Sequence, residues 1–156
     1  MSIIKLPKMT ENEIKEIIKS QDLCRIAFVD DKYPYISPFQ YVLFEGNLYF
    51  HFTDYGKKKR ILMKNPNVCV SIEKFEADFN TFYFISMQGK LEPVKDDALK
   101  NKIINQMVKT ARSKYSKNFL SVHGFEKIKG WDGFTAKDQL IYKFKQVGNS
   151  IGLKSI

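Results

Sequence analysis

Two neighbouring lysines that follow a glycine are the residues of this chain best suited to chemistry. The segment His51–Gly56 closes a predicted strand, and Lys57 and Lys58 open a predicted helix. The first amides of a helix have no intrahelical partners, and the aligned peptide dipoles favour an anion there. A glycine lets a phosphate approach the backbone, and two ammonium groups add positive charge. The pattern is typical of a phosphate-binding corner. Four consecutive basic residues are also common on a solvated helix face.

A histidine precedes this corner on the same strand. His51 alternates with Tyr49 and Thr53, so the three side chains share one face of the strand. Its imidazole, with an ordinary pKa near neutrality, could donate a proton to a reduced substrate, or it could be satisfied by a neighbouring side chain. His123 is interpreted as a surface or packing residue.

The elements that must position these residues are mostly strands. Apolar runs and apolar–polar alternation predict six of them, at 23–29, 33–44, 48–53, 68–73, 79–94 and 140–147. Short turns join the first three as a meander. Pro34 and Pro38 cannot donate ladder hydrogen bonds, so they are expected to face an edge, a bulge or a ligand, and Gly89 is expected to mark a bulge.

Helices are predicted between and after the strands. Thr10 and Glu13 have capping-box spacing at the start of a helix over 10–20. Asp54 is expected to cap the short helix that Asn65-Pro66 ends, and apolar spacing predicts helices over 96–112 and 118–129. Six strands joined mostly by tight turns, with helices at the periphery, predict a mainly β fold, a small antiparallel barrel.

Composition limits the classes of function. The 156 residues fit a single domain over 1–156, and the apolar share of 44% is enough for a core. No apolar stretch is long enough for a membrane helix and no signal peptide is recognised, so we expect a cytoplasmic protein without membrane contact. Cys24 and Cys69 match no metal spacing and are interpreted as buried thiols, and no metal site is predicted. The net charge of +9 is spread along the whole chain.

Several of these motifs together resemble a known family. Tyr49–Lys58 followed by Asn65-Pro66-Asn67-Val68 is similar to the pyridoxamine 5'-phosphate oxidase-like FMN-binding split barrels. In that family a strand ends in small polar residues, a basic pair opens a helix, and Asn-Pro precedes the next strand. The segment Pro34–Tyr41 resembles the strand that lines the flavin. The Tyr-Phe-His and Gly-Lys-Lys sequences are similar to the branch related to nitroimidazole-resistance proteins.

The resemblance implies a six-stranded antiparallel split β-barrel that binds FMN. Lys57 and Lys58 would hold the FMN phosphate, and His51, the candidate catalytic residue, would lie near the flavin or its substrate. The implied cofactor-binding set is Ser37, Pro38, Phe39, Gln40, His51, Phe52, Thr53, Gly56, Lys57 and Lys58. The family forms homodimers with flavins at the interface, so a partner chain would complete each site. Trp131 is then expected in the core or the dimer contact rather than as a lid on the flavin.

Three functions remain open from the sequence. The first is an FMN-dependent oxidoreductase that passes electrons from NADH or NADPH to a small molecule such as a nitro compound. The second is a non-catalytic flavin-binding sensor or electron carrier. The third, a basic barrel that binds nucleic acid, is disfavoured because the lysines are scattered and no RNA-binding signature is found. Vitamin B6 oxidation is disfavoured too, because no arginine follows Arg112. Segment 113–136 matches no part of the family.

Overall fold

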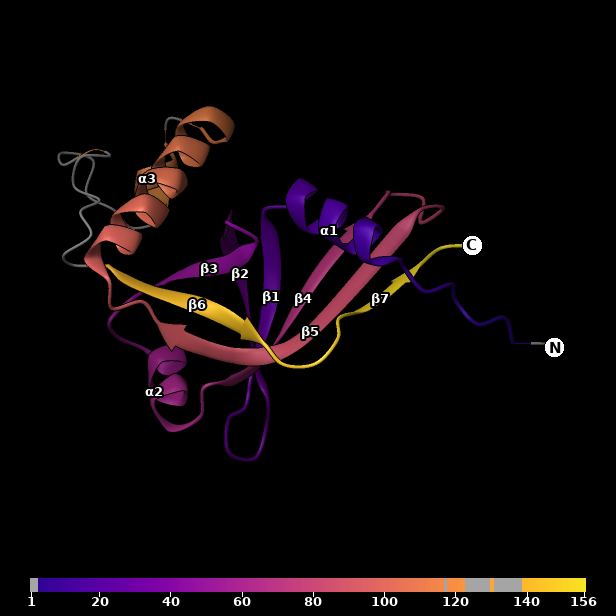
Figure 1. Cartoon of the computed structure of the whole chain (residues 1–156), viewed down its shortest axis with the longest axis horizontal. Coiled ribbons are helices and arrows are strands. Elements are labelled where there is room, and N and C mark those ends of the chain that lie inside the picture. The colour runs from indigo at the N-terminus through magenta and orange to yellow at the C-terminus, as the bar shows by residue number, and fades with distance from the viewer. Residues whose placement is uncertain (1–2, 117, 123–129, 131–138) are drawn as a thin grey trace.

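The computed structural model describes residues 3–116, 118–122, 130 and 139–156. Its helices are α1 (Glu11–Ser20), α2 (Lys57–Lys64), α3 (Asp97–Lys114) and α4 (Phe119–Val122). Its strands are β1 (Leu23–Phe28), β2 (Tyr35–Phe44), β3 (Asn47–Phe52), β4 (Asn67–Phe75), β5 (Phe82–Pro93), β6 (Leu140–Gln146) and β7 (Ile151–Lys154). In Figure 1 the strands curve around the centre, α3 extends away from them, and both chain ends lie on the opposite side.

Six of the strands close into an antiparallel barrel. Their order is β4-β1-β2-β3-β6-β5, and pairing of β4 with β5 completes the circle. The predicted barrel and its opening meander β1–β2–β3 are confirmed. The prediction missed β7, which pairs with β5 from Tyr83 to Ser86, beyond the end of the β5–β6 ladder.

Gly89 lies where β5 is paired on both sides. It stands opposite Val68 of β4 and Gln146 of β6, and both registers run through it without an extra residue. The predicted bulge at this position is therefore wrong. A glycine is required here for another reason, since a Cβ would lie 2.3 Å from the Lys145 carbonyl oxygen and 2.5 Å from the Phe144 ring.

The hydrophobic core has two parts. The larger part fills the barrel, where the inward side chains are almost fully buried, among them Phe28, Phe50, Ile26, Ile72 and Ile85. The smaller part lies outside the barrel, where Ile103 and Ile104 of α3 pack on Val42, Tyr49 and Ile141. This second cluster fixes the N-terminal half of α3 against the outer face of β2, β3 and β6.

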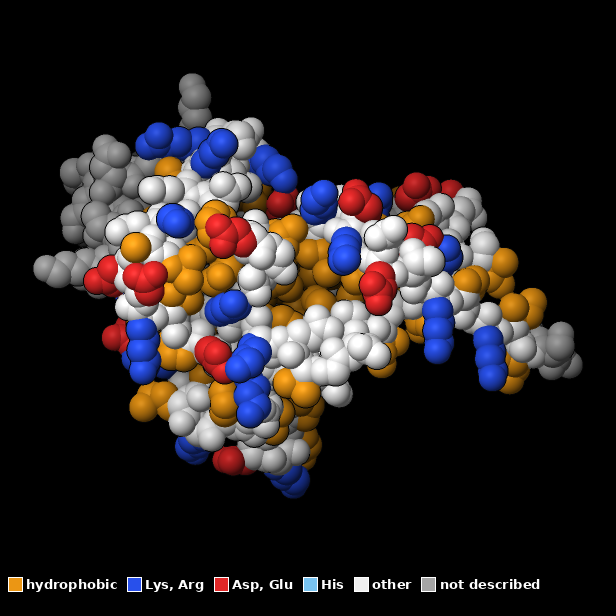
Figure 2. All heavy atoms as spheres, in the orientation of Figure 1, with side chains coloured by type: hydrophobic (Ala, Val, Ile, Leu, Met, Phe, Trp, Pro, Cys, Tyr) orange, Lys and Arg blue, Asp and Glu red, His pale blue; other side chains and the backbone are white. Residues whose placement is uncertain are grey.

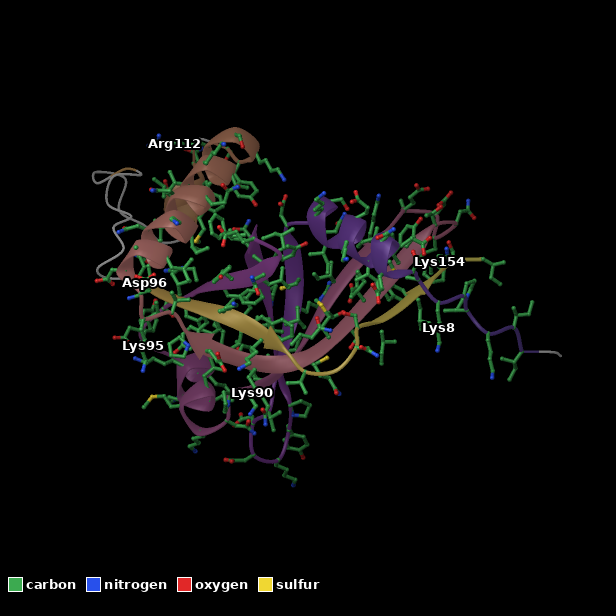
Figure 3. All side chains as sticks on the ribbon, in the orientation of Figure 1. Lys8, Lys90, Lys95, Asp96, Arg112 and Lys154 are labelled. Atoms are coloured by element: carbon green, nitrogen blue, oxygen red, sulfur yellow. The ribbon has the colours of Figure 1, made fainter. Side chains whose placement is uncertain are left out.

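Three of the described helices begin at identifiable N-cap residues. Thr10 and Glu13 form the predicted capping box, with Thr10 Oγ1 accepting from the Glu13 amide at 3.2 Å. Asp54 does not cap α2, because the N-cap is Gly56 and the Asp54 carboxylate instead pairs with Lys59. Asp96 caps α3 at the end near β6, and Figure 3 places Arg112 toward the other end of the helix.

The surface of the protein mixes charged and hydrophobic side chains, and its two cysteines differ in burial. None of the described helices is long and apolar enough to cross a membrane. On the face shown in Figure 2, basic and acidic side chains are interspersed, and hydrophobic side chains show in a hollow between α1 and β6. Cys24 is buried, which raises the pKa of its thiol to about 12, and Cys69 is half-buried with its Sγ 3.2 Å from the Ser86 hydroxyl.

Candidate functional site

An open cleft of about 460 Å³ lies at the outer surface of the barrel, between the strand ends and α3. Seven of the ten predicted cofactor-binding residues line it, namely Pro38, Phe39, Gln40, His51, Phe52, Thr53 and Lys58. They come from β2, from β3 and the residue after it, and from the first turn of α2. Segments separated in the sequence thus meet at one surface depression.

Strand alternation decides what each of these residues presents to the cleft. On β2, Pro38 and Gln40 are exposed on the outer face, whereas Phe39 points into the barrel. At the barrel mouth the rings of Phe39 and Phe52 lie 4.8 Å apart between centroids, and they form an aromatic floor under the cleft. Polar groups on one wall and flat apolar groups beneath suit a planar, partly polar ligand.

The positive charges in the first turn of α2 oppose the helix dipole. Gly56 adopts a φ of +90°, no side chain caps the helix, and a Cβ at Gly56 would meet nothing within 4 Å. The turn carries four cations, residues 57–60, and no acidic residue. Each cation at a helix N-terminus is unfavourable by about 0.3–1 kcal/mol when exposed. An anion at this uncapped end would make the arrangement favourable, because it would accept hydrogen bonds from the first amides of the helix and neutralise the lysines.

The three lysines of this turn point in different directions. Lys57 forms an ion pair with Asp30 at 3.1 Å and lies over the Tyr35 ring, while Lys59 pairs with Asp54. The Lys58 ammonium lies 4.7 Å from the centroid of the Phe39 ring, at the cleft. Among the described residues Lys58 has no carboxylate partner. Lys58 is thus the cation of this turn that is positioned for an anionic ligand.

Three predicted residues lie outside the cleft lining. Ser37 is buried, 8% exposed, on the inward face of β2, and its hydroxyl contacts the Pro38 carbonyl oxygen at 3.5 Å. Lys57 lines a separate depression on the other side of α2, together with Asp30 and Arg60. Gly56 lines neither depression and is the N-cap residue that directly precedes Lys57. His123 and Trp131 lie outside the described residues.

With this geometry established, the chain can be compared with known proteins. A sequence model of the family described as pyridoxamine 5'-phosphate oxidase matches residues 10–124. The chain belongs to the pyridoxamine 5'-phosphate oxidase family. The match begins at the capping box of α1 and ends two residues after α4, so it includes both walls of the cleft. It also covers the first part of segment 113–136, which the sequence analysis had matched to no part of the family. A search of curated proteins gave no match.

Solved structures with low sequence identity share the fold of this oxidase-family chain. An FAD-binding protein from Mesorhizobium loti aligns with a TM-score of 0.70 at 15% identity, covering 98% of this chain and 100% of its own. A putative 5-nitroimidazole antibiotic resistance protein from Bacteroides thetaiotaomicron aligns at 0.63 and 20%, covering 96% and 90%. The heme storage protein of Vibrio cholerae aligns at 0.65 and 18%, covering 92% and 94%. These likenesses confirm the split-barrel fold.

His51 is the histidine of the cleft in this oxidase-family barrel. Among the described residues that line the cleft, it and Lys58 are the two that could carry a charge. Its Nε2 is hydrogen-bonded to the side-chain oxygen of Gln139, which directly precedes β6. Because that oxygen only accepts, Nε2 carries the hydrogen in this arrangement. Burial lowers the pKa of His51, the Gln139 hydrogen bond opposes the shift, and Lys58 lowers the pKa further. The imidazole is therefore neutral at neutral pH.

The lowered pKa of His51 predicts a pH-dependent stability. The unfolded chain, with the ordinary value of 6.5, binds a proton before the folded chain does, so folding stability falls as pH falls below that value. We expect His51→Gln to lose less of its unfolding free energy than the wild type between about pH 7.5 and about pH 5. Urea unfolding at both pH values measures the difference. Equal losses in the two proteins would show that His51 titrates normally.

Three further residues line the cleft of this family member, and the sequence analysis did not predict them as site residues. Leu23 comes from the start of β1, Met107 from α3 and Phe119 from α4. The sequence does contain a signal for Met107, because this residue belongs to the apolar face of a predicted helix. That signal indicates burial and does not indicate which part of the barrel the helix covers. Leu23 and Phe119 have no local signal that connects them with residues 38–58.

Proposed function

We propose that this protein is a flavoprotein that binds FMN in the cleft and uses it to reduce a small molecule, with a nicotinamide as electron donor. Its membership of the pyridoxamine 5'-phosphate oxidase family supports this assignment. So do two proteins with the same fold, one an FAD-binding protein and one a putative nitroimidazole resistance protein. The observation that carries the proposal is the arrival of Lys58 and six other predicted residues at one cleft.

The residues present fit a flavin phosphate at the start of α2. Lys58 is without a carboxylate partner among the described residues, and the helix end beside it is uncapped and open. We assign the phosphate to Lys58 and the first amides of α2, with Lys57 as a more distant charge. Pro38, Phe39, Gln40, Phe52 and Thr53 would contact the ring and the ribityl chain. When bound, the flavin would supply hydride-transfer chemistry.

The chain's own residues would bind and orient the flavin and the substrate and would accept a proton. The aromatic floor of Phe39 and Phe52 excludes water from one side of the cleft. Gln139 holds Nε2 of His51 and so fixes the plane of the imidazole. Because Nε2 already donates its hydrogen to Gln139, we assign His51 the role of a neutral imidazole that contacts a substrate and accepts a proton at Nδ1.

A second copy of the chain would complete the site. Leu23 and Ile36 are 54% and 60% exposed on the outer face of β1 and β2, next to the cleft. Both side chains point out of the barrel on the paired strands β1 and β2, and exposed apolar surface beside a cleft favours association with another protein. We therefore propose a homodimer that covers this face, as the family resemblance implies.

The experiment that tests the proposal is cofactor binding by the purified protein. We expect a yellow protein that releases FMN, and a cofactor-free protein that binds FMN at least about tenfold more tightly than riboflavin, which lacks the phosphate. The molecular mass is measured on the same sample by size-exclusion chromatography with light scattering, with a dimer expected. Release of FAD or heme, or equal affinity for riboflavin and FMN, would contradict the FMN assignment.

A non-catalytic flavin carrier or sensor is the second candidate function. The observation that favours it is chemical, because the described residues that line the cleft include no carboxylate and only two side chains that could carry a charge, His51 and Lys58. Steady-state oxidation of NADH and NADPH with a nitroaromatic acceptor separates the two functions. Turnover supports the oxidoreductase, and flavin binding without turnover supports the carrier.

A further inference from the structure

A second, smaller cavity lies next to the cleft, between β2 and α3. Its volume is about 50 Å³, and Gln40, Met107 and Phe119 line both this cavity and the cleft. The remaining wall is mainly apolar and includes Val42 and Ala111. The two spaces are therefore neighbours that share three side chains.

The cavity exists because α3 is fixed on either side of a small residue, Ala111. In its N-terminal half, Ile103 and Ile104 pack on the barrel, and at its last residue the Lys114 ammonium contacts both carboxylate oxygens of Asp22 at 3.0 Å. Between these anchors Ala111 faces the barrel and is only 4% exposed. A larger side chain at this position would fill the gap, so alanine keeps it open.

Tyr115 and Phe119 close the cavity beyond the end of α3. Their rings are stacked, with centroids 4.8 Å apart and planes 13° from parallel. Met107 separates the cavity from the cleft, and its unbranched side chain has several accessible rotamers. A ligand that lies in the cleft can therefore extend an apolar group past Met107 toward Ala111.

We infer that this cavity is a substrate subsite that takes a short aliphatic substituent of the molecule held in the cleft. The inference deepens the proposed function and rests on it for the identity of that molecule as a reducible substrate. The cavity is roughly a third of the ~150 Å³ that accommodates benzene in an engineered apolar cavity. Its size therefore selects a chain of about one to three carbons and excludes a ring.

The test uses nitrobenzene and its 4-methyl, 4-propyl and 4-pentyl derivatives as probes. The chain has five methionines, and labelling their methyl groups with carbon-13 gives Met107 its own NMR signal, assigned with Met107→Leu. We expect binding to shift the Met107 signal and affinity to rise about threefold to fourfold per carbon as far as propyl. The pentyl derivative is expected to bind no more tightly than the propyl derivative.

Two variants of the wall test the location. Ala111→Leu should abolish the dependence on chain length and leave the affinity for nitrobenzene unchanged, whereas Ala98→Leu, on an exposed position of the same helix, should behave as the wild type. If Ala111→Leu does not fold, Ala111→Ser keeps the volume and adds a hydroxyl. It should reduce the gain from the propyl chain by about threefold.

The titrations are run on cofactor-free protein and repeated with FMN, whose binding is followed separately by fluorescence. FMN binding without any chain-length dependence overturns the subsite and leaves the proposed function standing. Chain-length dependence that Ala111→Leu removes supports the subsite, and it does so even if FMN fails to bind, which would overturn the proposed function alone. Chain-length dependence that survives in both Ala111 variants overturns the subsite.

Discussion

Lys58→Ala is expected to weaken FMN binding by about 10- to 100-fold. The phosphate would lose a charge-assisted contact from Lys58, the α2 cation that lines the cleft and that has no competing carboxylate among the described residues. Hydrogen bonds between ionised groups contribute about 1.5–3 kcal/mol, which corresponds to a change of this size in the dissociation constant. Quenching of FMN fluorescence on binding measures the affinity of wild type and variant.

The matched control for this prediction is Lys64→Ala. Lys64 is a lysine of the same helix, exposed at its last turn, and it lines the depression on the other side of α2. The control makes the same change in net charge, so it should change FMN affinity by less than about threefold. Riboflavin adds a second control, because its affinity should not respond to either substitution. Equal losses of FMN affinity in both variants would contradict the assignment of the phosphate to Lys58.

Gly89→Ala should have the largest effect on stability. The added Cβ would lie 2.3 Å from the Lys145 carbonyl oxygen and within 2.7 Å of two atoms of the Phe144 ring. Both neighbours belong to β6, which is paired with β5 at this point, so the strand cannot move away without opening the barrel. We expect a loss of about 3 kcal/mol or more in unfolding free energy, at the upper end of overpacking effects. Urea unfolding followed by circular dichroism measures the loss.

Gln88→Ala provides the comparison for Gly89. It introduces the same side chain one residue earlier in β5, on the exposed outer face, where no backbone atom blocks it. Its cost should stay below about 1 kcal/mol. A Gly89→Ala protein as stable as Gln88→Ala would mean that β5 and β6 are farther apart than described.

The sequence was most informative where local patterns decide structure. Alternation along residues 68–73 and 140–147 identified β4 and β6, and the spacing of Thr10 and Glu13 identified the start of α1. β7 was missed because it has four residues and contains Gly152. Its pairing depends on distant partners, since the Gly152 carbonyl accepts from the Met9 amide at 2.8 Å and a Cβ on Gly152 would meet Met9 at 2.9 Å.

The candidate site also combines features that local sequence decides with features that depend on distant parts of the chain. Residues 38–40 and 51–53 were found because each group lies on one short segment whose motif is recognisable. The difference between Lys57 and Lys58 was not predictable, because it depends on Asp30 and Phe39, which belong to other parts of the barrel. Met107 was recognised as apolar, but its place over the cleft depends on how α3 crosses the outer face of β2.

The uncapped first turn of α2 has a consequence for the lifetime of the protein. Four positive charges at the positive end of a dipole, two of them paired with Asp30 and Asp54, favour fraying of this turn when no further anion is bound. A ligand that binds only the closed form suppresses such opening in proportion to its concentration. Under the proposed function, scarcity of FMN would therefore expose the backbone around Gly56 to proteases, and abundance would protect it.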